Sequence, residues 1–311
     1  MDKIICVAGP TASGKTAFAV ELAKMVNGEV VSCDSMQIYR RMDIGTAKPT
    51  PEEMQGIAHH MLDVCEPDED FSVSRYCETA TPIVEDILAR GKVAIVAGGT
   101  GLYMDALIRG NSFAPYPSTG RRQELEALAD REGIEAVMAQ LRSVDPESAA
   151  RLHLSDRKRI IRAMEVYLET GQTITAHNLK TQAIPPKFSP LWFGLEDEDR
   201  QDLYNRIDAR VDKMLEAGLI DEIKALLAEG VPAKCTAMQA IGYKEFVAAL
   251  DRQCTIEEAA DQVRQSSRHY AKRQLTWFRR NKNVHWLRRG KGEGTSEVLE
   301  KGRQFLRDFD N

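Results

Sequence analysis

Near its start the chain reads Ile4-Ile5-Cys6-Val7-Ala8-Gly9-Pro10-Thr11-Ala12-Ser13-Gly14-Lys15-Thr16, an apolar run followed by a glycine-rich loop. The apolar run predicts a buried β-strand, and residues 9–16, called the phosphate loop below, fit the pattern GxxxxGK[ST]. A helical pattern follows the loop, so the backbone N–H groups at the start of that helix would face an anion. The stretch therefore predicts a site for a di- or triphosphate, without saying which one.

Two side chains of the phosphate loop suit this chemistry. Lys15 would add a mobile positive charge, and the Thr16 hydroxyl could hold Mg²⁺, which we expect as the cofactor. The whole loop, Gly9 to Thr16, is the predicted diphosphate- or nucleotide-binding segment. A glycine-rich turn that binds nothing is the structural alternative.

Further apolar runs alternate with helical patterns over the first hundred residues. Residues 29–33 and 93–97 are predicted strands, and residues 73–90 form an amphipathic helix that stops at Gly91. Strands that alternate with helices indicate βαβ units. The predicted fold is α/β: a P-loop NTPase-like parallel sheet with helices on both faces.

The pattern changes between two proline-bearing linkers, residues 113–118 and 184–190. The segment between them looks helical, with a helix start at Asp145-Pro146 and a helix over residues 157–170 that stops at Gly171. We expect an inserted all-helical domain at residues 113–187 and a core formed by residues 1–112 and 188–311. A strand at residues 191–195 would return to the sheet, a long helix would cover residues 256–281, and the last twenty residues, which are polar, would be peripheral.

Composition excludes several classes of protein. The 311 residues include 42 Lys and Arg against 47 Asp and Glu, a net charge of −5, so the chain is not a uniformly basic nucleic-acid binder. No apolar run approaches the roughly 18 residues of a membrane span. The six scattered cysteines form no CxxC pair, and the chain begins directly with a strand-like run. We therefore expect a cytoplasmic protein with reduced thiols.

One segment is locally basic. Residues 262–291 hold ten Lys or Arg and no Asp or Glu, interleaved with aromatic side chains such as Tyr270, Trp277 and Trp286. Clustered cations with flat rings suit RNA, through phosphate contacts and base stacking. The alternative is a solvated helix face with its aromatic residues in the core. A smaller cluster, Lys158, Arg159 and Arg162, is a weaker signal of the same kind.

Two polar residues stand where predicted strands end. A P-loop NTPase normally has a Walker-B Asp after an apolar strand, but the strand at 93–97 is followed by Gly98-Gly99-Thr100, and the acid comes earlier, as Asp34. Because carboxyl ends of parallel strands line the ligand crevice, Asp34, Thr100 and the phosphate loop should surround one cavity. Helix capping is the structural alternative for both Asp34 and Thr100.

With these residues in view, the chain resembles the tRNA dimethylallyltransferase family from Ile4 to about Leu287. The motifs that carry the resemblance are the phosphate loop, Asp34-Ser35-Met36-Gln37-Ile38-Tyr39, residues 42–49, 59–63, 98–103 and 240–245, and residues 270–279. The family's zinc-finger ligands, present in larger members, are absent, which indicates a bacterial-type short form.

The resemblance implies transfer of a dimethylallyl group from dimethylallyl diphosphate to N6 of the adenosine immediately 3′ of the anticodon. Lys15, Asp34 and Thr100 would be catalytic, with Asp34 as the base and Thr100 bonded near the bridging oxygen of the donor. The target base would be flipped out of its loop. The implied tRNA contacts are Asp34, Ser35, Met36, Gln37, Thr100, Arg122, Lys158, Arg159, Ile160, Ile161, Arg162, Lys272, Arg273 and Arg279.

Other functions fit parts of the sequence. A small-molecule P-loop kinase would use the phosphate loop and Asp34 but not the basic stretch. An isopentenyltransferase for free adenine nucleotides would not need the insertion, and an RNA-binding module would not need Lys15 and Asp34 together. We expect a transferase that acts as a monomer on the tRNA anticodon stem-loop and dimethylallyl diphosphate.

Overall fold

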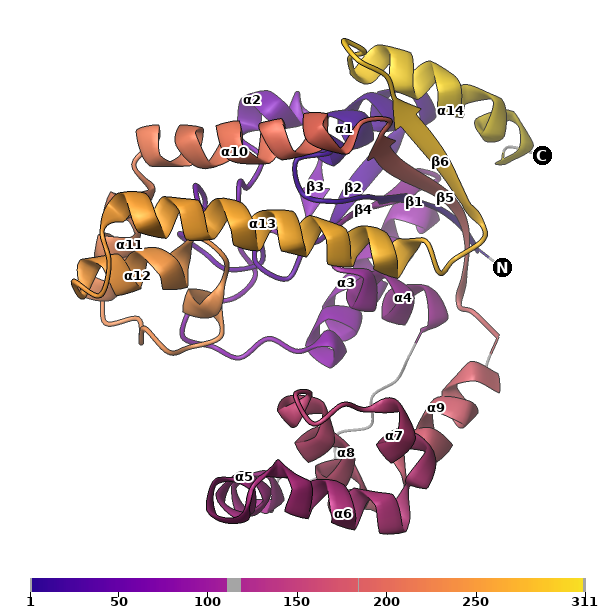
Figure 1. The fold of residues 1–311 in the computed structure, drawn as a ribbon. Helices are drawn as coiled ribbons and strands as arrows, with labels where there is room; N and C mark the ends of the chain where they lie inside the picture. Colours follow the sequence, from indigo (N-terminus) through magenta and orange to yellow (C-terminus); the bar gives the residue numbers. More distant parts are fainter. Residues whose placement is uncertain (1, 111–118, 184, 310–311) are drawn as a thin grey trace. The chain divides into compact units, whose positions relative to one another are not determined.

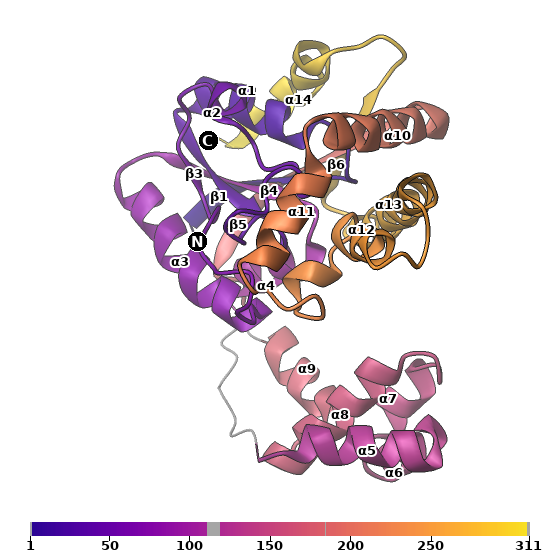
Figure 2. The same ribbon diagram turned by 90° about the vertical axis from the view of Figure 1, so that its left-hand side faces the viewer.

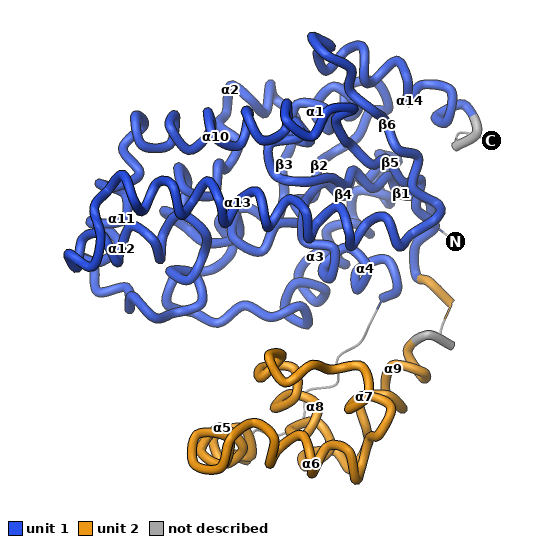
Figure 3. Tube along the Cα trace, in the orientation of Figure 1, with its two compact units in different colours: residues 1–110, 187–311 blue, residues 111–186 orange. Residues whose placement is uncertain are grey.

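The computed structural model describes residues 2–110, 119–183 and 185–309. The chain divides into two compact units, one of residues 1–110 and 187–311 and one of residues 111–186 (Figure 3). The second unit, called the helical unit below, has nearly the bounds expected for the insertion. The linker expected at residues 113–118 lies outside the described residues.

The first unit is built on one sheet of six parallel strands (Figure 1). In the order β3-β2-β4-β1-β5-β6, the strands are His59–His60, Gly28–Cys33, Val93–Gly98, Asp2–Ala8, Phe188–Asp197 and Val284–Arg289. Strand β2 is buried at every position, and β1 is buried from Ile4 onward. Such continuous burial is typical of parallel strands covered on both faces, and the predicted α/β fold is confirmed.

Helices cover both faces of the sheet. The N-terminal helices are α1 (Lys15–Val26), α2 (Pro51–Met54), α3 (Val73–Ala89) and α4 (Gly101–Arg109). Helices α1 and α14 (Thr295–Phe309) pack together and against strands, whereas α3 and α4 pack on each other and on β2 and β4. The N-terminal half of the core therefore follows the predicted alternation.

The C-terminal segment corrects one expectation. The described part of the last twenty residues, 292–309, is not merely peripheral, because Val298, Leu299 and Leu306 of α14 are buried in the same apolar cluster as Phe18 and Leu22 of α1. Burial of apolar side chains of this size stabilises a fold by about 1.5–3 kcal/mol each. Helix α14 is thus part of the sheet's hydrophobic cover.

Two further strand boundaries differ from the sequence prediction. Strand β5 begins at Phe188, three residues before the predicted start, so the linker expected to end at Pro190 is shorter. Pro190 is tolerated because β6 pairs with β5 only from Trp192 onward, so that edge is open at the proline. Strand β6 was not predicted, since its sequence lies inside the basic stretch.

The remaining helices of the first unit are α10 (Arg200–Glu216), α11 (Leu219–Ala228), α12 (Tyr243–Leu250) and α13 (Ile256–Phe278), with a short 3₁₀ turn at Ala237–Gln239. They pack on one another in sequence and lie together at one side of the sheet in both views (Figures 1 and 2). Helix α13 starts at a capping box formed by Thr255 and Glu258 and ends three residues before the predicted end.

The helical unit contains α5 (Arg121–Glu132), α6 (Ile134–Val144), α7 (Pro146–Arg151), α8 (Arg157–Thr170) and α9 (Ile174–Ala183). As predicted, Asp145 caps α7 by accepting a hydrogen bond from the Ser148 N–H at 3.1 Å, and Gly171 ends α8 in the left-handed conformation. The unit has its own apolar core, which includes Val137, Leu141, Ile160 and Ile161.

Over the described ranges, none of the helices combines the length and apolar character that a bilayer crossing requires.

Candidate active site

The phosphate loop lies where the sequence places it, between β1 and α1. Gly14, the residue before α1, has a φ of 83°, and a Cβ there would lie 2.7 Å from a guanidinium nitrogen of Arg289. A Cβ on Gly9 would lie 2.8 Å from the backbone oxygen of Leu195. Glycine is therefore required at Gly9 by close approach of the backbone, and at Gly14 by the left-handed backbone conformation.

Three arginines that sequence reasoning did not select hold the loop. Arg206 donates from Nε to the backbone oxygen of Ala12 at 3.0 Å, and Arg289 donates to that of Ser13 at 2.7 Å. Arg210 lies 3.4 Å from the Thr11 hydroxyl. Arg206 is ion-paired with Asp197, so the positive potential that favours an anion at the loop comes mainly from Arg210 and Arg289. The available signal was the four-residue spacing of Arg206 and Arg210, which places both on one face of α10.

Lys15 points back onto its own loop, with Nζ donating to the backbone oxygen of Pro10 at 2.6 Å. Burial lowers the pKa of Lys15 from its usual value to about 8, although the nearby Asp34 carboxylate opposes the shift. Burial also lowers the pKa of Arg210, again against the effect of Asp34. Lys15, Asp34 and Arg210 therefore share one electrostatic environment.

Magnesium could be accommodated at Thr16 only with help from a substrate. In the described part of the chain, no three His, Cys, Asp or Glu side chains form a group suited to a metal ion. Mg²⁺ commonly takes one or two protein ligands and fills its remaining positions with phosphate oxygens and water. The single hydroxyl of Thr16 fits that pattern.

Asp34 follows β2 and closes a turn rather than capping a helix. Its Oδ1 accepts hydrogen bonds from the backbone N–H groups of Met36 at 2.8 Å and Gln37 at 3.4 Å. No helix begins there, so the helix-cap alternative is wrong. Among the described residues, the other carboxylate oxygen has no hydrogen-bond partner, and the side chain is only partly buried. One oxygen is structural and the other is available to a ligand.

Thr100 occupies the position before α4, yet its side chain makes no capping bond. Its hydroxyl instead accepts from the Ser35 N–H at 3.1 Å and lies 3.4 Å from the Ser35 hydroxyl. Burial and Asp34 raise the pKa of Tyr270 on α13, whereas a hydrogen bond with Thr100 opposes that rise. The structure thus brings Asp34, Ser35 and Thr100 together with Tyr270 of the basic stretch.

The side-chain amide of Gln37 is hydrogen-bonded to other residues of the protein. Its amide nitrogen donates to the backbone oxygens of Ala47 at 3.0 Å and Thr46 at 3.3 Å, and its amide oxygen accepts from the Ser32 hydroxyl at 3.1 Å. The side chain therefore fastens residues 42–49 beside the turn of Asp34 and Met36.

The loop of residues 42–49 has a second anchor on α11. Glu222 accepts hydrogen bonds from three consecutive N–H groups, those of Asp43 and Ile44 at 2.8 Å and Gly45 at 3.2 Å. The Tyr243 hydroxyl donates to the same carboxylate at 2.6 Å. Sequence reasoning missed Glu222, because its backbone partners at residues 43–45 lie 177 to 179 residues away in the chain.

The positive charge of the basic stretch, residues 262–291, is partly neutralised in the folded protein by acidic residues outside the stretch. Several of its arginines pair with acidic residues of other segments, namely Arg264 with Asp212, Arg268 with Asp208, and Arg279 and Arg288 with Glu196. Lys272 and Arg273 are exposed, and Arg273 lies 5.6 Å from the centre of the Tyr270 ring. The aromatic residues are partly core, since Phe278 is buried and Trp277 donates to Asp105 at 3.0 Å.

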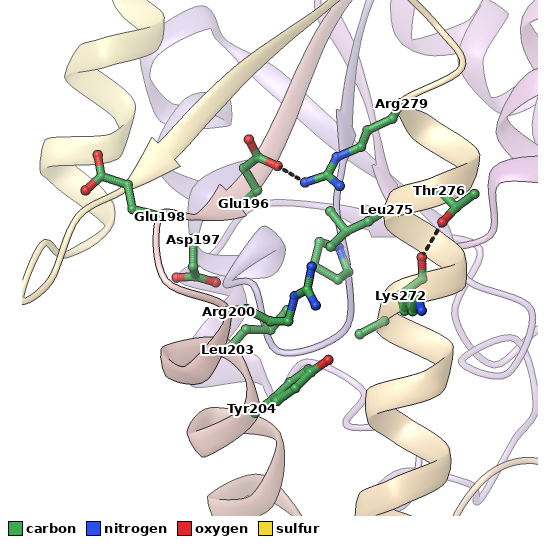
Figure 4. Close-up of a pocket in the computed structure, with 12 residues that line it drawn as sticks. Glu196, Asp197, Glu198, Arg200, Leu203, Tyr204, Lys272, Leu275, Thr276 and Arg279 are labelled. Carbon is green, nitrogen blue, oxygen red and sulfur yellow. Dashed lines mark hydrogen bonds and ion pairs between the residues drawn. The ribbon is translucent and has the colours of Figure 1, made fainter.

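A cavity of about 210 Å³ lies beside the phosphate loop, between α10, α13 and the end of β5 (Figure 4). Pro10 lines it together with Arg200, Tyr204 and Lys272. Arg279, which was expected to contact tRNA, also lines the cavity while it donates to Glu196 at 2.8 Å. One wall thus carries charged groups from the basic stretch.

The residues of the helical unit that were expected to contact tRNA fall into two groups, exposed cations and buried isoleucines. Lys158, Arg159 and Arg162 are exposed on α8, and Arg122 is exposed on α5 beside Glu126 at 3.1 Å. The prediction for Ile160 and Ile161 is wrong for their side chains, which are 0% and 2% exposed in the core of the unit. They alternate with the cations because the helix places neighbouring residues on different faces.

Comparison with known proteins identifies the family of the chain. The family model described as IPP transferase matches residues 37–281. A tRNA dimethylallyltransferase of Acetivibrio thermocellus is 42% identical over 310 residues, covering 99% of both chains. One from Halalkalibacterium halodurans is 46% identical over 287 residues, covering 92% of this chain and 91% of the relative.

Solved structures give the same result. The full-length tRNA isopentenylpyrophosphate transferase of Bacillus halodurans superposes with a TM-score of 0.75 at 41% identity, covering 100% of this chain and 97% of the other. A eukaryotic dimethylallyltransferase acting on tRNA gives a TM-score of 0.83 at 29% identity, covering 99% and 80%. The predicted resemblance and the transferase class are thereby confirmed, and the chain belongs to the IPP transferase family.

Proposed function

We propose that the chain transfers a dimethylallyl group from dimethylallyl diphosphate to N6 of the adenosine immediately 3′ of the tRNA anticodon. The observation that carries the proposal is the free carboxylate oxygen of Asp34 in the electrostatic environment of Lys15. A base for an amine and a cation for a diphosphate are the two groups that this transfer needs in one place. Relatives named tRNA dimethylallyltransferase support the same reaction.

The donor end would be the phosphate loop. N–H groups at the start of α1 and the charge of Lys15 would bind the diphosphate, and Arg210 would add positive potential. As the bond between C1 of the donor and its oxygen breaks, the electron pair leaves with the diphosphate, and these groups stabilise the charge. When bound, Mg²⁺ supplies further charge neutralisation, and the Thr16 hydroxyl would hold it.

The acceptor end would be the turn after β2. The N6 amine forms the new bond to C1, and its proton passes to the free oxygen of Asp34. Ser35, Met36 and Thr100 stand beside that carboxylate, and the Thr100 hydroxyl would also contact the donor. Atoms and charge balance, because one proton is released for each diphosphate formed.

The tRNA would be held mainly by exposed cations. Lys272 and Arg273 on α13, with Arg279, are proposed to bind phosphates near the site. Lys158, Arg159, Arg162 and Arg122 of the helical unit are proposed to contact the anticodon stem-loop. The reaction is proposed to be cytoplasmic and to need a single copy of the chain.

The test is an assay with labelled dimethylallyl diphosphate and three acceptors: tRNA, AMP or none. We expect label transfer to tRNA and none to AMP. Transfer to AMP alone would identify an enzyme for free nucleotides. Transfer to neither, together with ATP-dependent phosphorylation of a small molecule, would identify a kinase.

A further inference from the structure

Gln274 on α13 is a buried polar side chain, 5% exposed, that contacts two loops of the site. Its amide oxygen accepts a hydrogen bond from the backbone N–H of Thr11 in the phosphate loop at 2.8 Å. Its amide nitrogen donates to the backbone oxygen of Gly99, the residue before Thr100, at 3.1 Å. One side chain therefore spans the loop after β1 and the loop after β4.

These partners fix the orientation of the amide. If the two ends were exchanged, the nitrogen of Gln274 would face the Thr11 N–H, donor against donor, and the oxygen would face the Gly99 oxygen. A buried polar group left without its partner costs about 1–3 kcal/mol. A glutamine suits this position because it combines a donor and an acceptor at one length.

The approach of α13 to the loop after β4 is unusually close. A Cβ on Gly99 would lie 2.0 Å from the amide nitrogen of Gln274, and one on Gly101 would lie 2.2 Å from the Trp277 ring. Trp277 also donates to Asp105 of α4 at 3.0 Å. The two glycines that flank Thr100 thus leave room for Gln274 and Trp277 of α13.

We propose that Gln274 is a positioning residue for the transfer reaction, which sets the distance between the phosphate loop and Thr100. The proposal rests on the function proposed above. Gln274 would not touch either substrate. It acts through Thr11 and Gly99. On the same helix, Lys272 and Arg273 are exposed two residues and one residue before Gln274. Misplacement of a reacting group by about 1 Å can cost on the order of 10²-fold in rate.

Two substitutions separate this role from others. Gln274→Met keeps the length of the side chain and removes both hydrogen bonds without adding charge. Gln274→Glu keeps an acceptor for Thr11 and places a second oxygen against the Gly99 oxygen, unless the introduced carboxyl is protonated. Gln304→Glu is the matched control, because it makes the same charge change at an exposed position on α14, outside residues 262–291.

The measurements are single-turnover transfer to an anticodon stem-loop, the Kd of pyrophosphate, and the melting temperature of each protein. For Gln274→Met we expect a rate loss of about 10- to 100-fold and weaker pyrophosphate binding at temperatures where the protein is folded, with an unchanged stem-loop Kd. For Gln274→Glu we expect a loss that shrinks, relative to wild type, as the pH is lowered. Gln304→Glu should match wild type throughout.

A Gln274→Met protein that is folded and has wild-type transfer rate and pyrophosphate Kd would overturn the inference. So would losses that only track the unfolded fraction. A wild-type protein that transfers nothing to RNA would overturn the proposed function instead. In that case an unchanged pyrophosphate Kd in the folded Gln274→Met protein would still overturn the role of Gln274, and a weakened one would support it.

Discussion

The hydroxyl of Thr100 accepts a hydrogen bond from the backbone N–H of Ser35 at 3.1 Å, and it thereby joins the loop after β4 to the turn after β2. The same turn presents Asp34, so the Thr100 hydroxyl helps to hold the carboxylate relative to the sheet. The position of Thr100 before α4 had suggested a helix cap, but the hydroxyl is used across the site.

Replacing this hydroxyl tests the link. Thr100→Val keeps the branched shape and removes the acceptor, and we expect a loss of about 1 kcal/mol in the free energy of unfolding. The single-turnover transfer rate should fall by more than the loss of folded protein explains, because the turn that carries Asp34 loses its hydrogen bond to Thr100. Thr100→Ser is the control, because it retains a hydroxyl. Denaturant unfolding and single-turnover rates measure both effects, and equal behaviour of the two variants would contradict the assigned link.

The lowered pKa of Lys15 predicts how diphosphate binding depends on pH. In the free protein Lys15 is charged below about pH 8 and neutral above it. A bound diphosphate favours the charged form, so binding above pH 8 takes up a proton, and affinity should fall as the pH rises through that value, by at most about tenfold per pH unit.

Titration of pyrophosphate by calorimetry between pH 7 and 9.5 measures this dependence. Lys15→Arg keeps its charge throughout that range, and it corrects for the ionisation of pyrophosphate itself. The difference between the two profiles should appear near pH 8. Parallel profiles would mean that Lys15 does not titrate there.

Asp34→Asn separates the two oxygens of this side chain. The asparagine keeps an oxygen to accept from Met36, so the turn and the melting temperature should be preserved. The free oxygen is replaced by an amide that cannot take a proton, so single-turnover transfer should slow by on the order of 10² to 10⁴. A normal rate with a lowered melting temperature would make Asp34 purely structural.

Exposed cations of the helical unit predict a salt effect. Lys158→Ala should raise the KM for tRNA and leave the KM for the donor unchanged, because Lys158 is exposed on α8. The slope of log affinity against log salt should become shallower by about one. Arg131→Ala is the control, since Arg131 pairs with the adjacent Glu132 at 2.8 Å. An identical slope in both variants would remove Lys158 from the interface.

Because Gly99 and Gln274 lie in close contact, we expect that shortening Gln274 compensates for enlarging Gly99. Gly99→Ala should destabilise the protein, because the new Cβ would lie 2.0 Å from the amide nitrogen. In a Gln274→Ala background the same change should cost less, since the overlapping atoms are gone. A double-mutant cycle of unfolding free energies measures the coupling, and strictly additive losses would exclude the contact.

The features that could be predicted from the sequence are those that depend on the local pattern of residues. The phosphate loop, the buried strands and the caps at Asp145 and Gly171 are each specified by a few neighbouring residues. Asp34 and Thr100 could be placed near the loop because carboxyl ends of parallel strands meet at one edge.

The parts that were missed depend on contacts between distant segments. Nothing near Glu222 indicates that its carboxylate will accept from Asp43 and Ile44, and nothing near Gln274 indicates Thr11 and Gly99 as partners. The charge of residues 262–291 was overestimated for the same reason, since Glu196 lies far away in sequence. Burial of Ile160 and Ile161 follows from helix periodicity, which the resemblance alone did not take into account.

The most direct measurement uses two anticodon stem-loops that differ at one nucleotide, with adenosine or guanosine immediately 3′ of the anticodon. Each is incubated with labelled dimethylallyl diphosphate, and nucleosides and released diphosphate are quantified in a single turnover. The account predicts one labelled adenosine and one diphosphate per stem-loop with adenosine, and neither with guanosine, although both RNAs bind. Equal labelling of the two stem-loops, or diphosphate release without labelled RNA, would contradict it.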